Sequence, residues 1–149
     1  MSERQRIVIT AGLPGSGKST WLARLGVNAI SSDAIRQMLA DDITDQTIHA
    51  RVFATVRYIL RHRIAIGRPL TYVDATHSTV EERRPYINIG RSYGCDVEAV
   101  FFDVPLEICR QRNRLRERKV PDEAMEMMGA KLIVPSVGEG FRRVSVISY

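Results

Sequence analysis

A glycine-rich segment most constrains the fold of this 149-residue chain: Gly12-Leu13-Pro14-Gly15-Ser16-Gly17-Lys18-Ser19. It follows an apolar run, residues 6–10, that predicts a buried strand, and it precedes residues 19–25, which predict a helix. Glycines allow backbone conformations that a Cβ would hinder, so successive N–H groups can turn inward at the positive end of the new helix. This order of strand, loop and helix predicts an α/β fold that binds phosphate groups.

The same segment predicts a binding site for ATP. Lys18 can reach the β- and γ-phosphates, and the Ser19 hydroxyl can ligate Mg²⁺. A glycine-rich turn that binds nothing is the alternative, but the strand and helix on either side argue against it. The predicted ATP-binding residues in this segment are Gly12, Pro14, Gly15, Ser16, Gly17, Lys18, Ser19 and Thr20.

Length and composition indicate one globular domain, residues 1–149. No apolar run approaches the roughly 20 residues of a membrane span, so we expect no membrane partner. Residues 1–6 are polar and lack the apolar segment of a signal peptide, which favours a cytoplasmic location. A net charge of +5 is weak support for a polyanionic partner. Composition does not indicate the oligomeric state.

Strand and helix patterns alternate along the rest of the chain. Further strands are expected at 28–32, 69–74, 97–103 and 141–147, with helices in the segments between them. Regular alternation predicts a five-stranded parallel sheet flanked by helices. Ligands of such sheets bind at the carboxyl ends of the strands. Those ends carry the glycine-rich loop, Asp33, Asp74 and Asp103.

Asp33 and Arg36 follow the second strand, three residues apart. A carboxylate at this position can accept the proton of an attacking hydroxyl, although Asp33 could equally be the N-cap of the next helix. Arg36 could hold an anionic group of the acceptor, with a solvated helix arginine as the alternative. A base beside a phosphate clamp fits an acceptor that carries both a hydroxyl and a phosphate.

Asp74 ends the third strand, where a carboxylate can hold Mg²⁺ directly or through water. A cap at the strand end is the alternative interpretation of Asp74. Ser19 and Asp74 are therefore the predicted metal ligands.

Basic residues recur at every second position from Arg110 to Arg118. On a helix, Arg110, Arg114 and Arg118 would share one face, and Arg112 and Arg116 another. A segment that is basic on both sides predicts a lid that closes arginines over the phosphates and excludes water. A solvated basic helix is the alternative.

Other reactive residue types are not expected to be catalytic. His77 could face the cleft, but ordinary hydrogen bonding of a loop histidine is the preferred interpretation, and we expect Trp21 to pack in the core. Cys95 and Cys109 lack metal-like spacing and are expected to be small buried side chains.

These motifs together resemble the kinase domain of the polynucleotide 5′-hydroxyl kinases, within the wider P-loop phosphotransferases. The resemblance covers about residues 7–121, and more loosely the remainder. It rests on the segments Gly12–Trp21, Ser32–Gln37, Val73–His77, Glu82–Arg84, Phe102–Pro105 and Gln111–Asn113, followed by Val120-Pro121.

The resemblance implies a P-loop kinase fold and specific roles for several residues. Asp33 would be the general base, Arg36 would contact the 3′-phosphate of the acceptor, and Arg116 would act on the donor phosphates from the lid. Arg112 or Arg118 could take the role of Arg116, because the spacing from Arg116 to Val120-Pro121 is shorter than in some relatives. His77 stands where many relatives have asparagine.

The sequence thus predicts transfer of the γ-phosphate of ATP, with Mg²⁺, to the 5′-hydroxyl of a DNA or RNA end. Lys18, Asp33 and Arg116 are the predicted catalytic residues. Asp33, Arg36 and Asp74 are the predicted acceptor-binding residues, and Arg112 and Arg116 join the ATP-binding set. Two alternatives stay open: a P-loop kinase for a small metabolite such as a sugar, nucleoside or antibiotic, and an ATP-dependent regulatory module.

Overall fold

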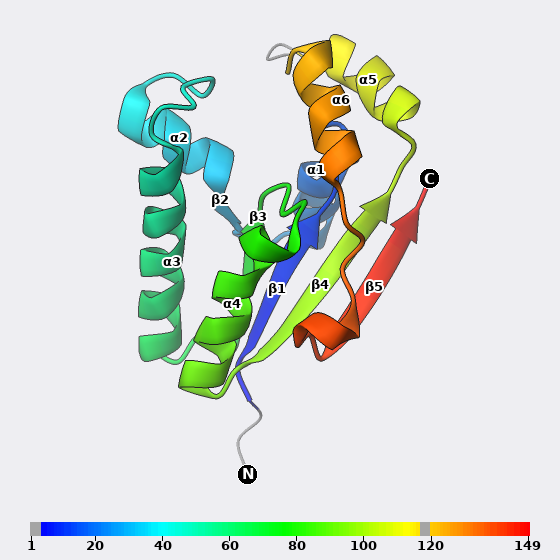
Figure 1. Ribbon diagram of the computed structural model, residues 1–149. Helices are drawn as coiled ribbons and strands as arrows, with labels where there is room; N and C mark the ends of the chain where they lie inside the picture. Colours follow the sequence, from blue (N-terminus) through cyan, green and yellow to red (C-terminus); the bar gives the residue numbers. More distant parts are fainter. Residues whose placement is uncertain (1–3, 117–119) are drawn as a thin grey trace.

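The computed structural model describes residues 4–116 and 120–149, in which five parallel strands form one sheet in the order β2-β3-β1-β4-β5 (Figure 1). The predicted α/β fold with a five-stranded parallel sheet is confirmed. The strands are β1 (Arg6–Ala11), β2 (Ile30–Ser31), β3 (Leu70–Asp74), β4 (Asp96–Asp103) and β5 (Arg143–Ser148).

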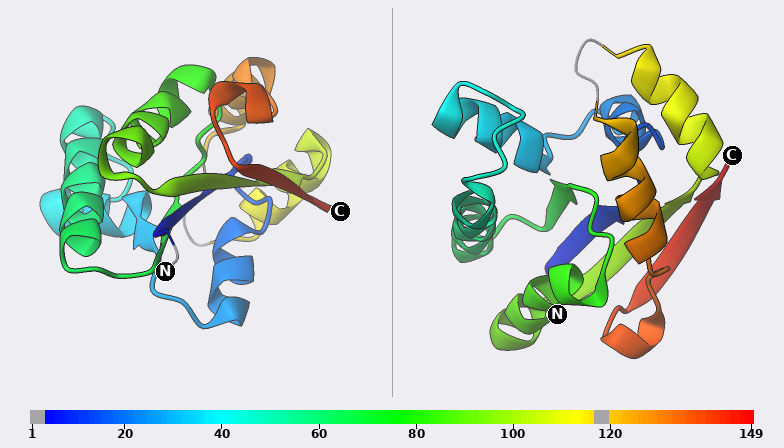
Figure 2. Two further views of the ribbon diagram at one scale, coloured as in Figure 1. Left: turned by 90° about the horizontal axis from the view of Figure 1, so that it is seen from below. Right: turned by 45° about the horizontal axis from the view of Figure 1, so that its top comes forward.

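Helices cover both faces of this sheet. Seen from below, α3 and α4 lie on one face and α1 on the other, while α5 and α6 lie near the carboxyl ends of the strands (Figure 2). None of the helices in the described residues is long and apolar enough to span a membrane. The helices are α1 (Lys18–Leu25), α2 (Ser32–Ala40), α3 (His49–Ala65), α4 (Val80–Tyr93), α5 (Leu106–Arg114) and α6 (Asp122–Lys131), with a 3₁₀ turn η1 (Val137–Glu139) before β5.

Side chains alternate across β1, and this alternation divides the core into two layers. Ile7 and Ile9 pack in the cluster that includes residues of α3 and α4, whereas Val8 packs on the opposite face. Trp21 of α1 covers that second face, with its ring edge-on to Tyr72 and Phe102. The expected packing role of Trp21 is confirmed.

The strand register brings the predicted site residues to one rim. Ile9 of β1 pairs with Val73 of β3, and Ser31 of β2 pairs with Asp74. The glycine-rich loop after β1, the carboxylate of Asp74 and the start of α2 therefore lie at the same edge, because the carboxyl ends of parallel strands coincide.

Several boundaries differ from the prediction. The second strand was expected at 28–32, but β2 holds only Ile30 and Ser31, because the Ser31 hydroxyl accepts a hydrogen bond from the Ala34 N–H and begins α2 at Ser32. The helix α6 was not predicted. Both cysteines are buried and free, as expected.

Candidate active site

The glycine-rich loop connects β1 directly to α1, which begins at Lys18. Gly15 has a φ of +82°, and a Cβ at this position would lie 2.6 Å from the carbonyl oxygen of Cys109. Glycine is therefore required where α5 crosses the loop. The Gly12 N–H donates to the Thr76 carbonyl at 2.9 Å, so the loop is also tied to the segment after β3.

Lys18 is buried at the centre of this loop, with 8% of its surface exposed. Its Nζ donates to the carbonyl oxygens of Gly12 at 2.9 Å and Leu13 at 2.8 Å. Burial lowers the pKa of Lys18 to about 8; the Asp74 and Asp33 carboxylates oppose this shift, and Arg116 adds to it. All three side chains thus lie within electrostatic reach of the ammonium. An anionic phosphate would be a stronger acceptor for Nζ than these neutral carbonyls.

ATP binding should depend on the protonation of Lys18. Below pH 8 the ammonium is charged and can bind phosphate; above pH 8 the free protein must take up a proton to do so. We expect the Kd for ATP to rise about tenfold per pH unit above 8 and to be flat between pH 6 and 7.5. Titration calorimetry across this range measures the effect. Lys18→Arg should remove the pH dependence, and a pH-independent Kd in the wild-type protein would contradict the prediction.

Ser19 and Asp74 meet beside the loop. The exposed Ser19 hydroxyl donates to Asp74 Oδ2 at 2.8 Å, so the carboxylate at the end of β3 reaches the first turn of α1. Mg²⁺ prefers hard oxygen ligands and takes only one or two protein carboxylates, with waters and substrate phosphates completing its coordination. The hydroxyl and carboxylate oxygens fit this requirement. Within the described part of the chain, no cluster of three or more His, Cys, Asp or Glu side chains offers a metal site made by protein alone.

Asp33 lies in the first turn of α2, with its side chain exposed. The interpretation of Asp33 as an N-cap is wrong, because Ser31 occupies that position and makes the capping hydrogen bond. Asp33 is thus not needed to begin the helix. Its carboxylate lies within electrostatic range of the Lys18 ammonium, whose pKa it raises slightly against the larger effect of burial. Its role as a base stays a prediction.

Arg36 is buried one turn later in α2, with 4% of its surface exposed. Its Nη1 donates to the Asp45 carbonyl at 2.8 Å, and its Nη2 lies 3.3 Å from His49 Nδ1 at the start of α3. The alternative of a solvated helix arginine is therefore wrong. The segment between α2 and α3 holds the guanidinium in place. Contact with an acceptor phosphate stays a prediction.

His49 is a residue that sequence reasoning missed. Burial lowers its pKa, and the adjacent Arg36 lowers it further, so a neutral imidazole can accept the hydrogen bond from the guanidinium. His49 also packs against Phe53, with 4.8 Å between the ring centroids. No sequence pattern signals this partner, because a loop separates it from α2.

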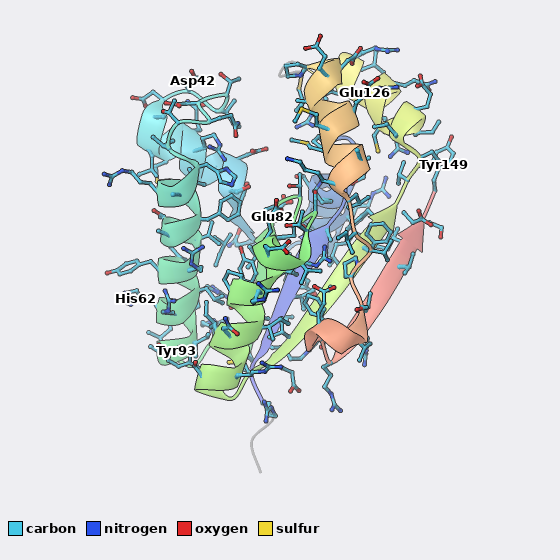
Figure 3. All side chains as sticks on the ribbon, viewed as in Figure 1. Asp42, His62, Glu82, Tyr93, Glu126 and Tyr149 are labelled. Atoms are coloured by element: carbon cyan, nitrogen blue, oxygen red, sulfur yellow. The ribbon has the colours of Figure 1, made fainter. Side chains whose placement is uncertain are left out.

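The arginine-rich segment agrees with the predicted lid only in part. Arg112 Nη1 donates to the Gly15 carbonyl at 3.3 Å, and its guanidinium lies 5.5 Å from the ring centroid of Tyr149. Tyr149 is labelled at the end of β5 in Figure 3. Arg116 is half-buried and close enough to lower the pKa of Lys18. Arg112 therefore contacts the glycine-rich loop, and Arg116 lies within electrostatic range of Lys18; their binding of donor phosphates stays a prediction.

The other arginine row points elsewhere. Arg110 pairs with Glu126 of α6 and with Glu107, and Arg114 lies 3.5 Å from the carboxylate of Asp122. These two arginines thus form ion pairs that join α5 to α6. Arg118, the third member of the predicted row, lies outside the described residues.

Among the described residues the arginine-rich segment is helical up to Arg114, and residues 117–119 lie outside the described part of the chain. The helix α5 ends at Arg114, and the buried Asn113 side chain contacts the chain again at Val120. Its Nδ2 donates to the Val120 carbonyl at 2.6 Å, and its Oδ1 accepts from the Val120 N–H at 3.0 Å. The Asn113 side chain thus joins the end of α5 to the residues that precede α6.

His77 has a structural position beneath the loop. Its backbone has a φ of +41°, and its buried Nδ1–H donates to the Thr10 carbonyl at 2.6 Å. Its Nε2 accepts from the Tyr86 hydroxyl at 3.0 Å. Burial lowers the pKa of His77 to about 4, so the ring is neutral at physiological pH. The expectation that this histidine makes ordinary hydrogen bonds is confirmed.

Comparison with known sequences identifies related kinases. A family model described as an AAA domain matches residues 7–135. The chain is 24% identical over 153 residues to a bifunctional polynucleotide phosphatase/kinase of Schizosaccharomyces pombe, covering 99% of this chain and 35% of that protein. It is 32% identical over 90 residues to the human L-seryl-tRNA(Sec) kinase, covering 60% of this chain and 26% of that protein. The chain thus spans about a third or less of these relatives.

Solved structures share the fold. The Pnkp1/Rnl/Hen1 RNA repair complex contains a chain that matches with a TM-score of 0.73 and 24% identity, over 89% of this chain and 45% of that chain. A gluconokinase from Sinorhizobium meliloti 1021 matches with a TM-score of 0.60 and 18% identity, over 98% of this chain and 84% of that chain. A chain of an RNA repair complex and a gluconokinase therefore share this architecture.

Proposed function

The chain belongs to the AAA domain family, its named relatives are P-loop kinases, and we propose that it transfers the γ-phosphate of ATP to the 5′-hydroxyl of a DNA or RNA strand. The observation that carries the proposal is the Asp33–Arg36 pair on the first turns of α2. An exposed carboxylate lies in the first turn of α2, at the rim that carries the glycine-rich loop, and a buried, anchored guanidinium follows three residues later. This pair suits an acceptor that has both a hydroxyl and a nearby phosphate.

Donor binding is assigned to the loop, Lys18 and the two lid arginines. The loop N–H groups and Lys18 would bind the phosphates at the N-terminus of α1. Arg112 and Arg116 would approach from the opposite side and stabilise negative charge on the transferring group. Ser19 and Asp74 would hold Mg²⁺, which would supply neutralisation of charge on the β- and γ-phosphates.

Acceptor activation is assigned to Asp33. Its carboxylate would accept the proton of the 5′-hydroxyl while the hydroxyl oxygen forms a bond to the γ-phosphorus. The bond between that phosphorus and the β–γ bridging oxygen breaks, and ADP leaves with the bridging oxygen. Arg36 would hold the 3′-phosphate of the same nucleotide and so orient the hydroxyl for in-line attack.

Three other functions compete with this proposal. The shared fold of the gluconokinase favours a kinase for a small metabolite, in which Arg36 would have no phosphate to bind. The human relative favours a hydroxyl group carried by a tRNA. An ATP-dependent regulatory module is a third alternative, which would bind ATP and phosphorylate no acceptor. Acceptors with and without a 3′-phosphate separate the first of these from a strand-end kinase.

Replacement of Arg36 should weaken only the phosphorylated acceptors. A charge-assisted hydrogen bond to phosphate contributes about 1.5–3 kcal/mol, so Arg36→Gln should raise KM for a nucleoside 3′-phosphate roughly 10- to 150-fold. Activity on the unphosphorylated nucleoside, and KM for ATP, should be unchanged. The exposed neighbour provides a matched control, Gln37→Ala. Equal loss on both acceptors would contradict the role of Arg36 and favour a small-metabolite kinase.

A further inference from the structure

The side of α3 that faces away from the sheet carries an unusual set of residues. The buried positions Val52, Val56 and Leu60 define the core side of this helix. The periodicity of 3.6 residues places an opposite set outward, and all of its members are exposed (His62 in Figure 3). We define the outer face of α3 as Arg51, Tyr58, Arg61 and His62.

This face lies in a segment without negative charge. From Gln46 to Val73 the chain has five arginines and two histidines, but no aspartate or glutamate. Other arginines of this protein are neutralised nearby: Arg83 pairs with Glu139, and Arg110 pairs with Glu126. Neither Arg51 nor Arg61 forms an ion pair with a carboxylate in the described part of the chain. The face is therefore complementary to a polyanion.

An exposed aromatic residue lies between the two arginines. Tyr58 is 63% exposed, and its ring meets the His62 ring in an edge-to-face contact with 4.5 Å between centroids. This contact holds one edge of the solvent-exposed tyrosine ring against the His62 ring. Proteins that bind single strands combine cationic groups along the backbone with such rings, on which bases stack. The combination favours a nucleic acid strand over an acidic protein surface.

The outer face also begins close to the candidate acceptor site. The first residue of α3, His49, contacts Arg36, and Arg51 follows two residues later. From Arg51 to Arg61 the helix rises about 15 Å, which is long enough for several successive phosphates. The acidic residues before α3, Asp41, Asp42 and Asp45, would repel phosphates and so exclude that loop from the path.

We propose that the outer face of α3 binds the single-stranded acceptor on the 3′ side of the 5′ end that receives the phosphate. Arg51 and Arg61 contact phosphates of the strand, and a base stacks on Tyr58. This inference rests on the proposed function, since it extends the path of the acceptor beyond Arg36. It assigns two contributions to affinity: the strand end binds at Arg36, and the following nucleotides bind along α3. Long acceptors then bind more tightly than a single nucleotide.

Salt dependence of binding tests the proposal without requiring catalysis. A 5′-hydroxyl oligonucleotide of about 12 nucleotides, labelled at its 3′ end, is titrated by fluorescence anisotropy at several salt concentrations. Each single-strand phosphate contact contributes about −0.7 to the slope of log K against log salt. Arg51→Gln/Arg61→Gln should therefore reduce the magnitude of that slope by about 1.4. Tyr58→Ala should weaken binding with no change in slope. Arg24→Gln/Arg91→Gln removes two exposed arginines from α1 and α4 and should leave the slope unchanged.

Turnover of a nucleoside 3′-phosphate separates this proposal from the proposed function. The Arg51→Gln/Arg61→Gln variant should phosphorylate this minimal acceptor at the wild-type rate. If the wild-type protein phosphorylates neither this acceptor nor the 5′-hydroxyl oligonucleotide, while oligonucleotide binding still depends on Arg51 and Arg61, the proposed function fails and the α3 surface stands. The proposed α3 surface would be wrong if the Arg51→Gln/Arg61→Gln variant kept the wild-type salt slope. It would also be wrong if the slope fell equally in the Arg24→Gln/Arg91→Gln control. Loss of poly-glutamate binding with unchanged oligonucleotide binding would assign the face to an acidic protein and would also overturn it.

Discussion

The kcat of the Asp33→Asn variant for phosphoryl transfer should be about 10²- to 10⁴-fold below the wild-type value, and the variant should still bind ATP. The asparagine side chain keeps the size of the aspartate but cannot accept the proton of the attacking hydroxyl. Asp33 is exposed and does not cap α2, so its replacement should leave the fold intact. Label transfer from ATP measures kcat, and titration calorimetry measures ATP binding in the same preparation.

A second carboxylate on the same rim provides the control. Asp103 ends β4 and is exposed, and it is not among the predicted catalytic or acceptor-binding residues. Asp103→Asn should therefore keep kcat near the wild-type value. If Asp33→Asn retains most activity, or if Asp103→Asn loses as much, Asp33 is not the base.

The Arg83→Leu variant should be destabilised by about 3–5 kcal/mol, because it breaks a buried ion pair and leaves the partner carboxylate unpaired. Arg83 of α4 has no exposed surface, and its Nε and Nη2 donate to Glu139 at 2.9 and 3.0 Å. Its Nη1 donates to the His77 carbonyl at 2.8 Å. One guanidinium thus joins α4 to η1 and to the segment after β3, which itself holds the glycine-rich loop at Gly12.

Urea denaturation measures this effect, with the next residue of the same helix as the matched control. Arg84 is exposed, so Arg84→Leu should change the free energy of unfolding by less than about 0.5 kcal/mol. Glu139→Gln should fall between the two variants, since the amide oxygen can still accept from Arg83. Equal stability of Arg83→Leu and Arg84→Leu would show that the ion pair does not support the fold.

Local patterns explain why the sheet could be predicted. Strands and helices have different apolar periods, and glycine or proline marks several of their ends, as at Gly94 after α4. The common rim followed from the parallel arrangement alone. The contact between Ser19 and Asp74, 55 residues apart, agrees with the prediction because both residues lie at ends of neighbouring elements.

Long-range side-chain contacts could not be predicted in the same way. The anchoring of Arg36 by Asp45 and His49 depends on the path of a loop, and Arg83 meets Glu139 across 56 residues. The ion-pair partners of the arginine repeat could not be predicted for a related reason. Its spacing indicates helical faces, but α6, which neutralises Arg110, carries no comparably strong signal.

The central claim is that the γ-phosphate is passed to the hydroxyl at a strand end. In the most direct measurement, the protein is incubated with Mg²⁺ and ATP labelled at the γ-phosphate, and each acceptor is added in a separate reaction. The acceptors are a 5′-hydroxyl oligonucleotide, the same oligonucleotide bearing a 5′-phosphate, a serylated tRNA and gluconate. The proposed function predicts label on the 5′-hydroxyl strand and none on its 5′-phosphorylated counterpart. Label on gluconate or on the seryl group, or release of labelled phosphate to water alone, would contradict it.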